Sequence, residues 1–175
     1  MDAHYDQVMK ARATLAGAPE RLYFAYSTVL DRAAFEEWRA QHGYGFFDLP
    51  AGETAEALDV GLVFDFPSRW WGGRVAGLAA TPGASVHGRL FRIAGVDWPV
   101  VQHKEGYITG MCVEQEVRVR LASGETVTAT AFATNPARQS TGGEISPRFV
   151  EALLRGARAA GLPEAWLAEV ARSAK

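Results

Sequence analysis

The stretch from residue 113 to residue 134 constrains the fold of this chain most strongly. Apolar or neutral side chains alternate there with charged ones, namely Val113, Gln115, Val117, Val119 and Leu121 against Glu114, Glu116, Arg118 and Arg120. Successive side chains of a strand point to opposite faces, so this pattern predicts a half-exposed strand. A turn at Ala122-Ser123-Gly124 leads into a second segment at 126–134, rich in Thr, Val and Ala. We therefore predict an antiparallel hairpin closed by a glycine that can adopt positive φ.

Four further segments are predicted to be strands. Residues 21–26 are typical of a buried strand that runs directly into the small polar residues Ser27 and Thr28. Strands are also expected at 60–66, 74–79 and 85–93, with Pro82-Gly83 forming the turn between the last two. Residues 42–57 hold three glycines and Pro50, and are expected to be irregular.

Helix start signals place four helices among these strands. Asp31 is a suitable N-cap for a helix to about Gln41, and Pro99 suits the first turn of a short helix over 96–104. Ser146-Pro147 begins a third helix, which Gly161 and Pro163 end, and a last helix follows. Residues 1–20 are expected to form a short helix or a loose arm.

The predicted order β-α-β-β-β-α-β-β-α-α indicates an α+β fold with a mainly antiparallel, barrel-like sheet. The chain has 175 residues, of which 48% are hydrophobic, and this suits a single domain over residues 1–175. We find no repeat and no linker to a second domain.

Charge and hydropathy argue against nucleic-acid and membrane partners. The 18 basic and 20 acidic residues are well mixed and leave a net charge of −2, without a basic stripe. No apolar run approaches the roughly 18 residues that a membrane span needs. The first residues do not resemble a secretory signal, so we expect a cytoplasmic protein.

The chain offers few groups for chemistry. Cys112 is the single cysteine, which excludes an intramolecular disulfide and a cysteine-based zinc cluster, and we expect it to be a small core residue. The four histidines form no i, i+4 pair, and phosphate-binding or nucleophile-elbow motifs are absent. The sequence therefore gives no support for a helical metal site.

Glu105 is the strongest catalytic candidate. It lies between the predicted short helix and the alternating strand, where its carboxylate could serve as an acid–base group facing the turn after residue 26. The alternative is a surface glutamate that ends a helix before Gly106. His103 could tune Glu105, but a solvated position on the helix face is favoured. Trp70-Trp71 could stack on a ligand, although anchoring a loop on the core is the favoured role.

Taken in order, several motifs across residues 21–170 resemble those of the γ-glutamylcyclotransferase family. They are Leu22-Tyr23-Phe24-Ala25-Tyr26, Phe64-Asp65-Phe66, Trp71-Gly72-Gly73, Gly88-Arg89-Leu90-Phe91, Glu105-Gly106 with Gly110-Met111, and Ser146-Pro147 through Gly161-Leu162-Pro163. The resemblance implies a barrel of about six strands with flanking helices, no cofactor, and assembly as a homodimer.

The resemblance also implies a reaction. The α-amine of a γ-glutamyl amide attacks its own γ-carbonyl, which releases 5-oxoproline and an amine or amino acid, with Glu105 as general acid and base. Backbone N–H groups of the turn would bind the substrate carboxylate and the oxyanion. The substrate-binding residues implied are Tyr23, Phe24, Ala25, Tyr26, Ser27, Thr28 and Phe149.

The chain departs from the family pattern at the predicted site. Ser27-Thr28-Val29 replaces Gly-Ser-Asn, and a serine there would strain the turn if the family glycine has positive φ. Phe149 lacks the hydroxyl of a ligand-contacting tyrosine, and Cys112 stands where some members have tyrosine. The segment 31–57 is longer than usual and is expected to add a lid or close one side of the pocket.

Three functions remain open at this point. The leading hypothesis is a lyase that acts on an atypical γ-glutamyl amide. The altered turn and Phe149 favour a non-catalytic module that binds a small ligand or a protein on the same fold. A third hypothesis is an acyl- or amide-transfer enzyme that uses the same pocket.

Overall fold

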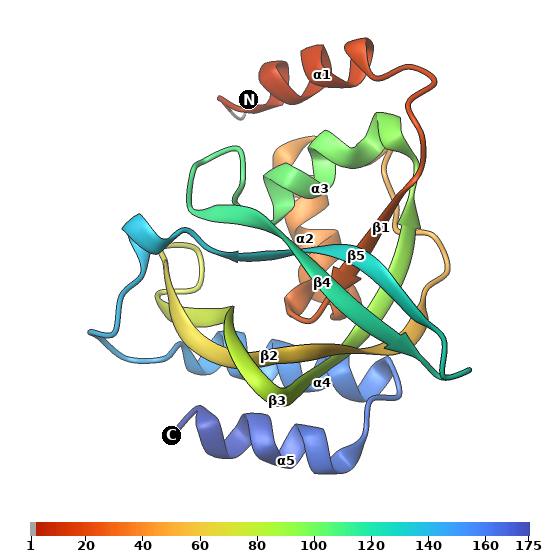
Figure 1. Cartoon of the computed structure of the whole chain (residues 1–175). Helices are drawn as coiled ribbons and strands as arrows, with labels where there is room; N and C mark the ends of the chain where they lie inside the picture. The colour runs from red at the N-terminus through yellow and green to blue at the C-terminus, as the bar shows by residue number, and fades with distance from the viewer. Residues whose placement is uncertain (1–2) are drawn as a thin grey trace.

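A closed barrel is the centre of the computed structural model, which describes residues 3–175 (Figure 1). Within these residues five strands form the barrel in the order β1-β3-β2-β4-β5: β1 Arg21–Ala25, β2 Glu53–Ser68, β3 Gly73–Ile93, β4 Cys112–Leu121 and β5 Thr126–Thr134. The pair β1·β5 is parallel, and the other pairs are antiparallel. The α+β, mainly antiparallel barrel is confirmed, and so is the hairpin of β4 and β5.

The prediction of separate strands at 74–79 and 85–93 was wrong, and five described strands replace the expected six. Residues 73–93 form one strand that pairs with β2 along its length. Pro82-Gly83 lies at a bulge, where the pairing passes from Leu58↔Ser85 to Val60↔Ala80. Asp59 accepts a hydrogen bond from the Gly83 amide across 3.0 Å, which stabilises the bulge. A bulge accommodates the proline and the glycine without reversing the direction of the strand. Turn-forming residues alone therefore did not show whether the chain turns or continues as one strand.

The irregular segment is also shorter than expected, because β2 begins at Glu53 instead of near residue 60. Thr54 and Ala55 already pair with Arg89 and Gly88 of β3. Long-range pairing with β3 therefore overrides the weak strand pattern of these residues.

Five α-helices lie around the barrel in the described part: α1 Tyr5–Thr14, α2 Arg32–His42, α3 Trp98–Lys104, α4 Pro147–Ala159 and α5 Glu164–Ser173. Short 3-10 helices occupy Thr28–Leu30, Gly95–Asp97 and Pro136–Arg138. The predicted caps are present: Asp31 accepts from the Ala34 amide across 3.1 Å, and Ser146 accepts from the Phe149 amide across 3.2 Å. No helix in residues 3–175 has both the length and the apolar character needed to cross a membrane.

Two buried clusters hold these elements together. One joins the barrel to α4 and α5 through residues such as Phe24, Phe149 and Trp166. The other packs the barrel against α1, α2 and α3 through residues such as Tyr23 and Phe35. Because the side chains of β1 alternate between the two clusters, β1 is buried on both faces. The end of β1 is therefore held rigidly at the place where the candidate site lies.

Candidate active site

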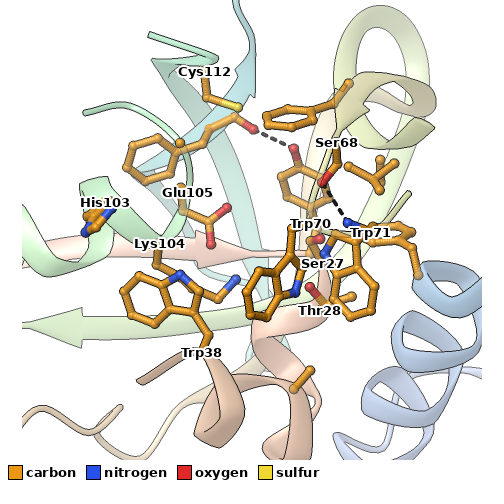
Figure 2. Close-up of a pocket in the computed structure, with 18 of the residues that line it drawn as sticks. Ser27, Thr28, Trp38, Ser68, Trp70, Trp71, His103, Lys104, Glu105 and Cys112 are labelled. Atoms are coloured by element: carbon orange, nitrogen blue, oxygen red, sulfur yellow. Dashed lines mark hydrogen bonds between the residues drawn. The ribbon is translucent and has the colours of Figure 1, made fainter. Parts of the chain in front are cut away.

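A pocket of about 200 Å³ opens where the end of β1 faces the end of α3 (Figure 2). Residues of the β1 exit, α2, the β2–β3 turn, α3, β4, β5 and α4 line it, among them Tyr26, Ser27, Thr28, Trp38, His42, Trp70, Trp71, Lys104, Glu105, Cys112, Phe132 and Phe149. The walls are mostly aromatic, and Lys104 and Glu105 lie side by side in them. Such apolar walls with a few polar groups are typical of small-molecule sites.

Glu105 is the C-cap residue directly after α3, and its side chain lines this pocket. The following Gly106 has φ +84, as expected for a glycine just after a helix end. The backbone of Glu105 is thus the ordinary helix end foreseen in the alternative interpretation. Its side chain is not an ordinary surface group, because Oε1 accepts a hydrogen bond from the Tyr23 hydroxyl across 2.6 Å.

Tyr23 is buried in β1 and positions this carboxyl group. Burial, together with the charge of Glu105, raises the pKa of Tyr23 well above its ordinary value, so the phenol remains a donor. Tyr26, two residues on, has a different role. Its hydroxyl donates to the Phe132 carbonyl and ties the end of β1 to β5.

The turn after β1 presents backbone donors to the pocket. Ser27 has φ −120 and ψ −156, which is extended backbone, and Thr28–Leu30 then form one 3-10 turn. The first N–H groups of any helix lack partners inside it, so the amides that begin this turn are available to a ligand. Ser27 and Thr28 line the pocket opposite Glu105.

Comparisons with known proteins show which fold this chain shares. The AIG2-like family model matches residues 85–170, a segment that contains Glu105 and Phe149. A solved structure named γ-glutamyl cyclotransferase superposes with a TM-score of 0.71 at 22% identity, over 87% of this chain and 86% of that one. The fold is therefore γ-glutamylcyclotransferase-like. The resemblance inferred from the sequence is thereby confirmed.

Two other solved structures share the fold. An uncharacterized human protein gives a TM-score of 0.70 at 23% identity, over 87% of this chain and 86% of that one. YkqA from Bacillus subtilis gives 0.72 at 19% identity over 94% of this chain, which spans 57% of that protein. None of the curated proteins compared with the chain matches its sequence.

The pocket contains some of the predicted substrate-binding residues and not others. The pocket is lined by Tyr26, Ser27, Thr28 and Phe149. Tyr23 lies outside the lining and contacts Glu105 through its hydroxyl group. Phe24 and Ala25 lie in the two buried clusters, outside the pocket lining. These placements follow from the position of Phe24 and Ala25 within β1, where both side chains are buried in the core.

The departures from the family pattern have clear structural outcomes. The expected strain at Ser27 does not arise, because its φ is negative. Val29 is buried with Phe35 and Trp38 and does not line the pocket. Phe149 forms an apolar wall, and its ring packs edge-on against Trp71 with centroids 5.6 Å apart. The pocket therefore has no side-chain donor at positions 29 and 149.

Three residues of the pocket wall were not named from the sequence. Trp38 and His42, one helical turn apart on α2, belong to the segment 31–57 that was expected to close one side of the pocket, and their i, i+4 spacing was an available signal. Lys104 is half-buried beside Glu105. Burial lowers the pKa of its ammonium, and the nearby Glu105 charge opposes that effect.

Trp71 anchors a loop and Trp70 is exposed to the pocket, so each of the two roles considered for this pair falls to a different residue. The Trp71 amide donates to Ser68 Oγ across 3.2 Å, and the Trp71 carbonyl accepts from Ser146 Oγ across 2.7 Å, so Trp71 anchors its loop. Trp70 stays 36% exposed at the pocket and is free to contact a ligand.

His103 and Cys112 are both buried. The prediction of a solvated His103 was wrong, since its Nδ1 lies 2.7 Å from the Tyr44 hydroxyl under the segment that follows α2. Cys112 is a core residue as expected, and burial raises the pKa of its thiol, which disfavours a nucleophilic role. Within residues 3–175, no three His, Cys, Asp or Glu side chains are grouped so as to hold a metal ion.

Proposed function

We propose that this chain is a cyclotransferase-type lyase that converts a γ-glutamyl amide into 5-oxoproline and a free amine. The observation that carries the proposal is the Glu105 carboxyl group, held by Tyr23 in a pocket that faces the Ser27–Thr28 turn. At the coarser level, the γ-glutamylcyclotransferase-like fold and the AIG2-like segment support a cyclotransferase-like function. The substrate and the residue roles belong to the proposal.

The chemistry needs one mobile proton carrier and no enzyme nucleophile. Glu105 takes a proton from the substrate α-ammonium, and the resulting amine attacks the γ-carbonyl carbon to form the lactam C–N bond. Collapse of the tetrahedral intermediate breaks the bond to the departing nitrogen. Of the three protons on the α-ammonium, one stays on the lactam nitrogen and two pass to the leaving group, which departs as an ammonium ion.

The pocket suits this intramolecular reaction in size and polarity. Its volume of about 200 Å³ is below the roughly 300–1,000 Å³ of sites for drug-sized ligands, so a compact, folded-back substrate fits best. Holding the amine near the carbonyl reduces the entropic part of the barrier. The amides at the start of the Thr28–Leu30 turn are the oxyanion donors in this scheme.

The test is turnover of a panel of γ-glutamyl amides by the purified protein, with 5-oxoproline measured by mass spectrometry. Glu105→Gln keeps the shape of the side chain but removes the base, and it is expected to abolish product while leaving the melting temperature near that of the wild type. Glu125→Gln, in the exposed β4–β5 turn, is the matched control and should retain activity. A wild-type protein that yields no 5-oxoproline from any member of the panel would exclude the lyase.

A non-catalytic binding module is the second candidate, and it is favoured by the absence of a side-chain donor to the pocket at positions 29 and 149. A binding module would be stabilised against heat by 5-oxoproline or γ-glutamyl compounds without converting them. Action in the cytoplasm, a part in glutathione metabolism, a single domain over residues 1–175 and assembly as a homodimer stay predictions.

A further inference from the structure

We propose that Lys104 is the specificity residue that binds the α-carboxylate of the γ-glutamyl group. The inference rests on the proposed function and goes beyond it, because it assigns a substrate contact to a residue outside the sequence-derived site. It limits the substrates to γ-glutamyl compounds whose α-amine and α-carboxylate are both free.

The position of Lys104 supports this role. It is the last residue of α3, directly before Glu105, and both side chains line the same pocket. In Figure 2 the amine of Lys104 extends past Trp38 toward Trp70 and the centre of the pocket. Its Nζ lies 5.7 Å from the centre of a Trp38 ring. The side chain is therefore directed inward along an aromatic wall instead of outward into solvent.

Within residues 3–175, no side chain or carbonyl forms a hydrogen bond or a close ion pair with the ammonium group of Lys104. The charge of Glu105 acts on this group only at longer range. Half-burial has removed part of its water shell, which lowers its pKa. A carboxylate bound beside it would replace that water and restore the preference for the charged form.

The charges of the pocket match an amino-acid head group. An α-ammonium and an α-carboxylate share one carbon atom, so a site that binds both needs an anionic and a cationic group close together. Glu105 is the anionic group that receives the α-ammonium in the proposed reaction, and Lys104 is the adjacent cationic group. With the α-carboxylate on Lys104, the backbone amides at Ser27 and Thr28 remain for the oxyanion.

The apolar replacements at the site make such a contact more important. Val29 is buried away from the pocket, and Phe149 presents a phenyl ring to it. Among the side chains of the described pocket wall, Lys104 alone carries a positive charge that is independent of histidine protonation. A single charged donor would contribute strongly to the choice of ligand.

Matched ligands test the contact without catalysis. 5-Oxoproline carries the carboxylate, and 5-oxoprolinamide has the same ring with a neutral amide. Calorimetry on the wild type should show 5-oxoproline binding about tenfold more tightly or better. Lys104→Met should remove this preference, and Lys104→Arg should keep most of it. Lys10→Met, on the exposed side of α1, is the control and should bind as the wild type does.

A second measurement identifies which carboxylate Lys104 binds. In turnover assays, Lys104→Met should raise KM to a similar extent for a γ-glutamyl dipeptide and for a γ-glutamyl alkylamide, whose leaving group has no carboxylate. An effect confined to the dipeptide would overturn the proposal, because it would place Lys104 at the leaving group. Equal weakening of 5-oxoproline and 5-oxoprolinamide would also overturn it, since that is the result of a damaged pocket.

The outcomes separate this inference from the proposed function. Turnover by the wild type, combined with unchanged ligand preference in Lys104→Met, would leave the lyase standing and remove the assignment of Lys104. A carboxylate preference that depends on Lys104, without turnover of any γ-glutamyl amide, would support the binding contact and exclude the lyase.

Discussion

The Tyr23 hydroxyl lies 2.6 Å from Oε1 of Glu105, and this hydrogen bond joins residues that are 82 positions apart. Tyr23 comes from the middle of β1, and Glu105 directly follows α3. The donor, Tyr23, lies in the buried cluster that packs the barrel against α1, α2 and α3, and the acceptor, Glu105, lies in the pocket wall. It fixes the direction of a carboxyl group that would otherwise rotate freely at a helix end.

Tyr23→Phe removes this hydrogen bond and keeps the buried ring. Because hydrogen bonds to charged groups contribute about 1.5–3 kcal/mol, we expect kcat to fall by about 10- to 100-fold. KM should change little, since Tyr23 does not itself line the pocket. Steady-state kinetics and circular dichroism check this result. An unchanged kcat in a folded variant would show that the orientation of Glu105 does not depend on Tyr23.

The neighbours Trp70 and Trp71 should respond differently to replacement by alanine. The Trp71 ring packs edge-on against Phe149, so we expect Trp71→Ala to lower the free energy of unfolding by about 2–3 kcal/mol. Trp70 is 36% exposed, and Trp70→Ala should change the free energy of unfolding by no more than about 0.5 kcal/mol. Trp70→Ala should instead raise KM. Denaturant titration and kinetics on both variants compare the two effects.

Asp31 should make stability depend on pH at the acidic end. Hydrogen bonds from Arg155, and a weaker one from the Ala34 amide, hold the pKa of its carboxyl below the ordinary value of 3.8. A lowered folded pKa means that the stabilisation is complete above 3.8 and disappears as pH falls through the folded value.

Asp31→Asn tests this dependence, because asparagine can still cap α2 but cannot form the ion pair. We expect it to cost about 1 kcal/mol at neutral pH, given that Arg155 is half exposed. The difference from the wild type should shrink when urea titrations are repeated at progressively lower pH. A difference that stays constant with pH would assign the effect to packing instead of charge.

Gly88 allows β1 and β3 to approach each other closely. A Cβ atom at this position would lie 2.2 Å from the Ala25 carbonyl oxygen and 2.8 Å from the Phe24 ring. Gly88→Ala should therefore push the end of β1 away and cost about 1–3 kcal/mol. Gly45→Ala is the matched control, since a Cβ there meets nothing within 4 Å. Thermal denaturation of both variants, with 5-oxoproline binding as a second measurement, tests whether the displacement reaches the pocket.

Much of the local structure was predictable because it depends on neighbouring residues. The alternation at 113–121 identifies β4, and the caps Asp31 and Ser146 identify the starts of α2 and α4. Glu105 was identifiable for a similar reason, since few other side chains in the chain suit acid–base work. The length of β3 was not predictable, because Pro82-Gly83 favours a turn locally and only pairing with β2 carries the strand through it.

The amino-acid order by itself determined the starts of α2 and α4, the hairpin of β4 and β5, and which carboxyl group is available for chemistry. The tertiary structure decided what surrounds that group: Tyr23 behind it, Lys104 beside it, and Trp38 and His42 across the pocket. It also decided that His103 is buried under the segment after α2. The physical reason is that local patterns depend on backbone preferences over a few residues, whereas a pocket depends on packing between segments that only the closed barrel brings together.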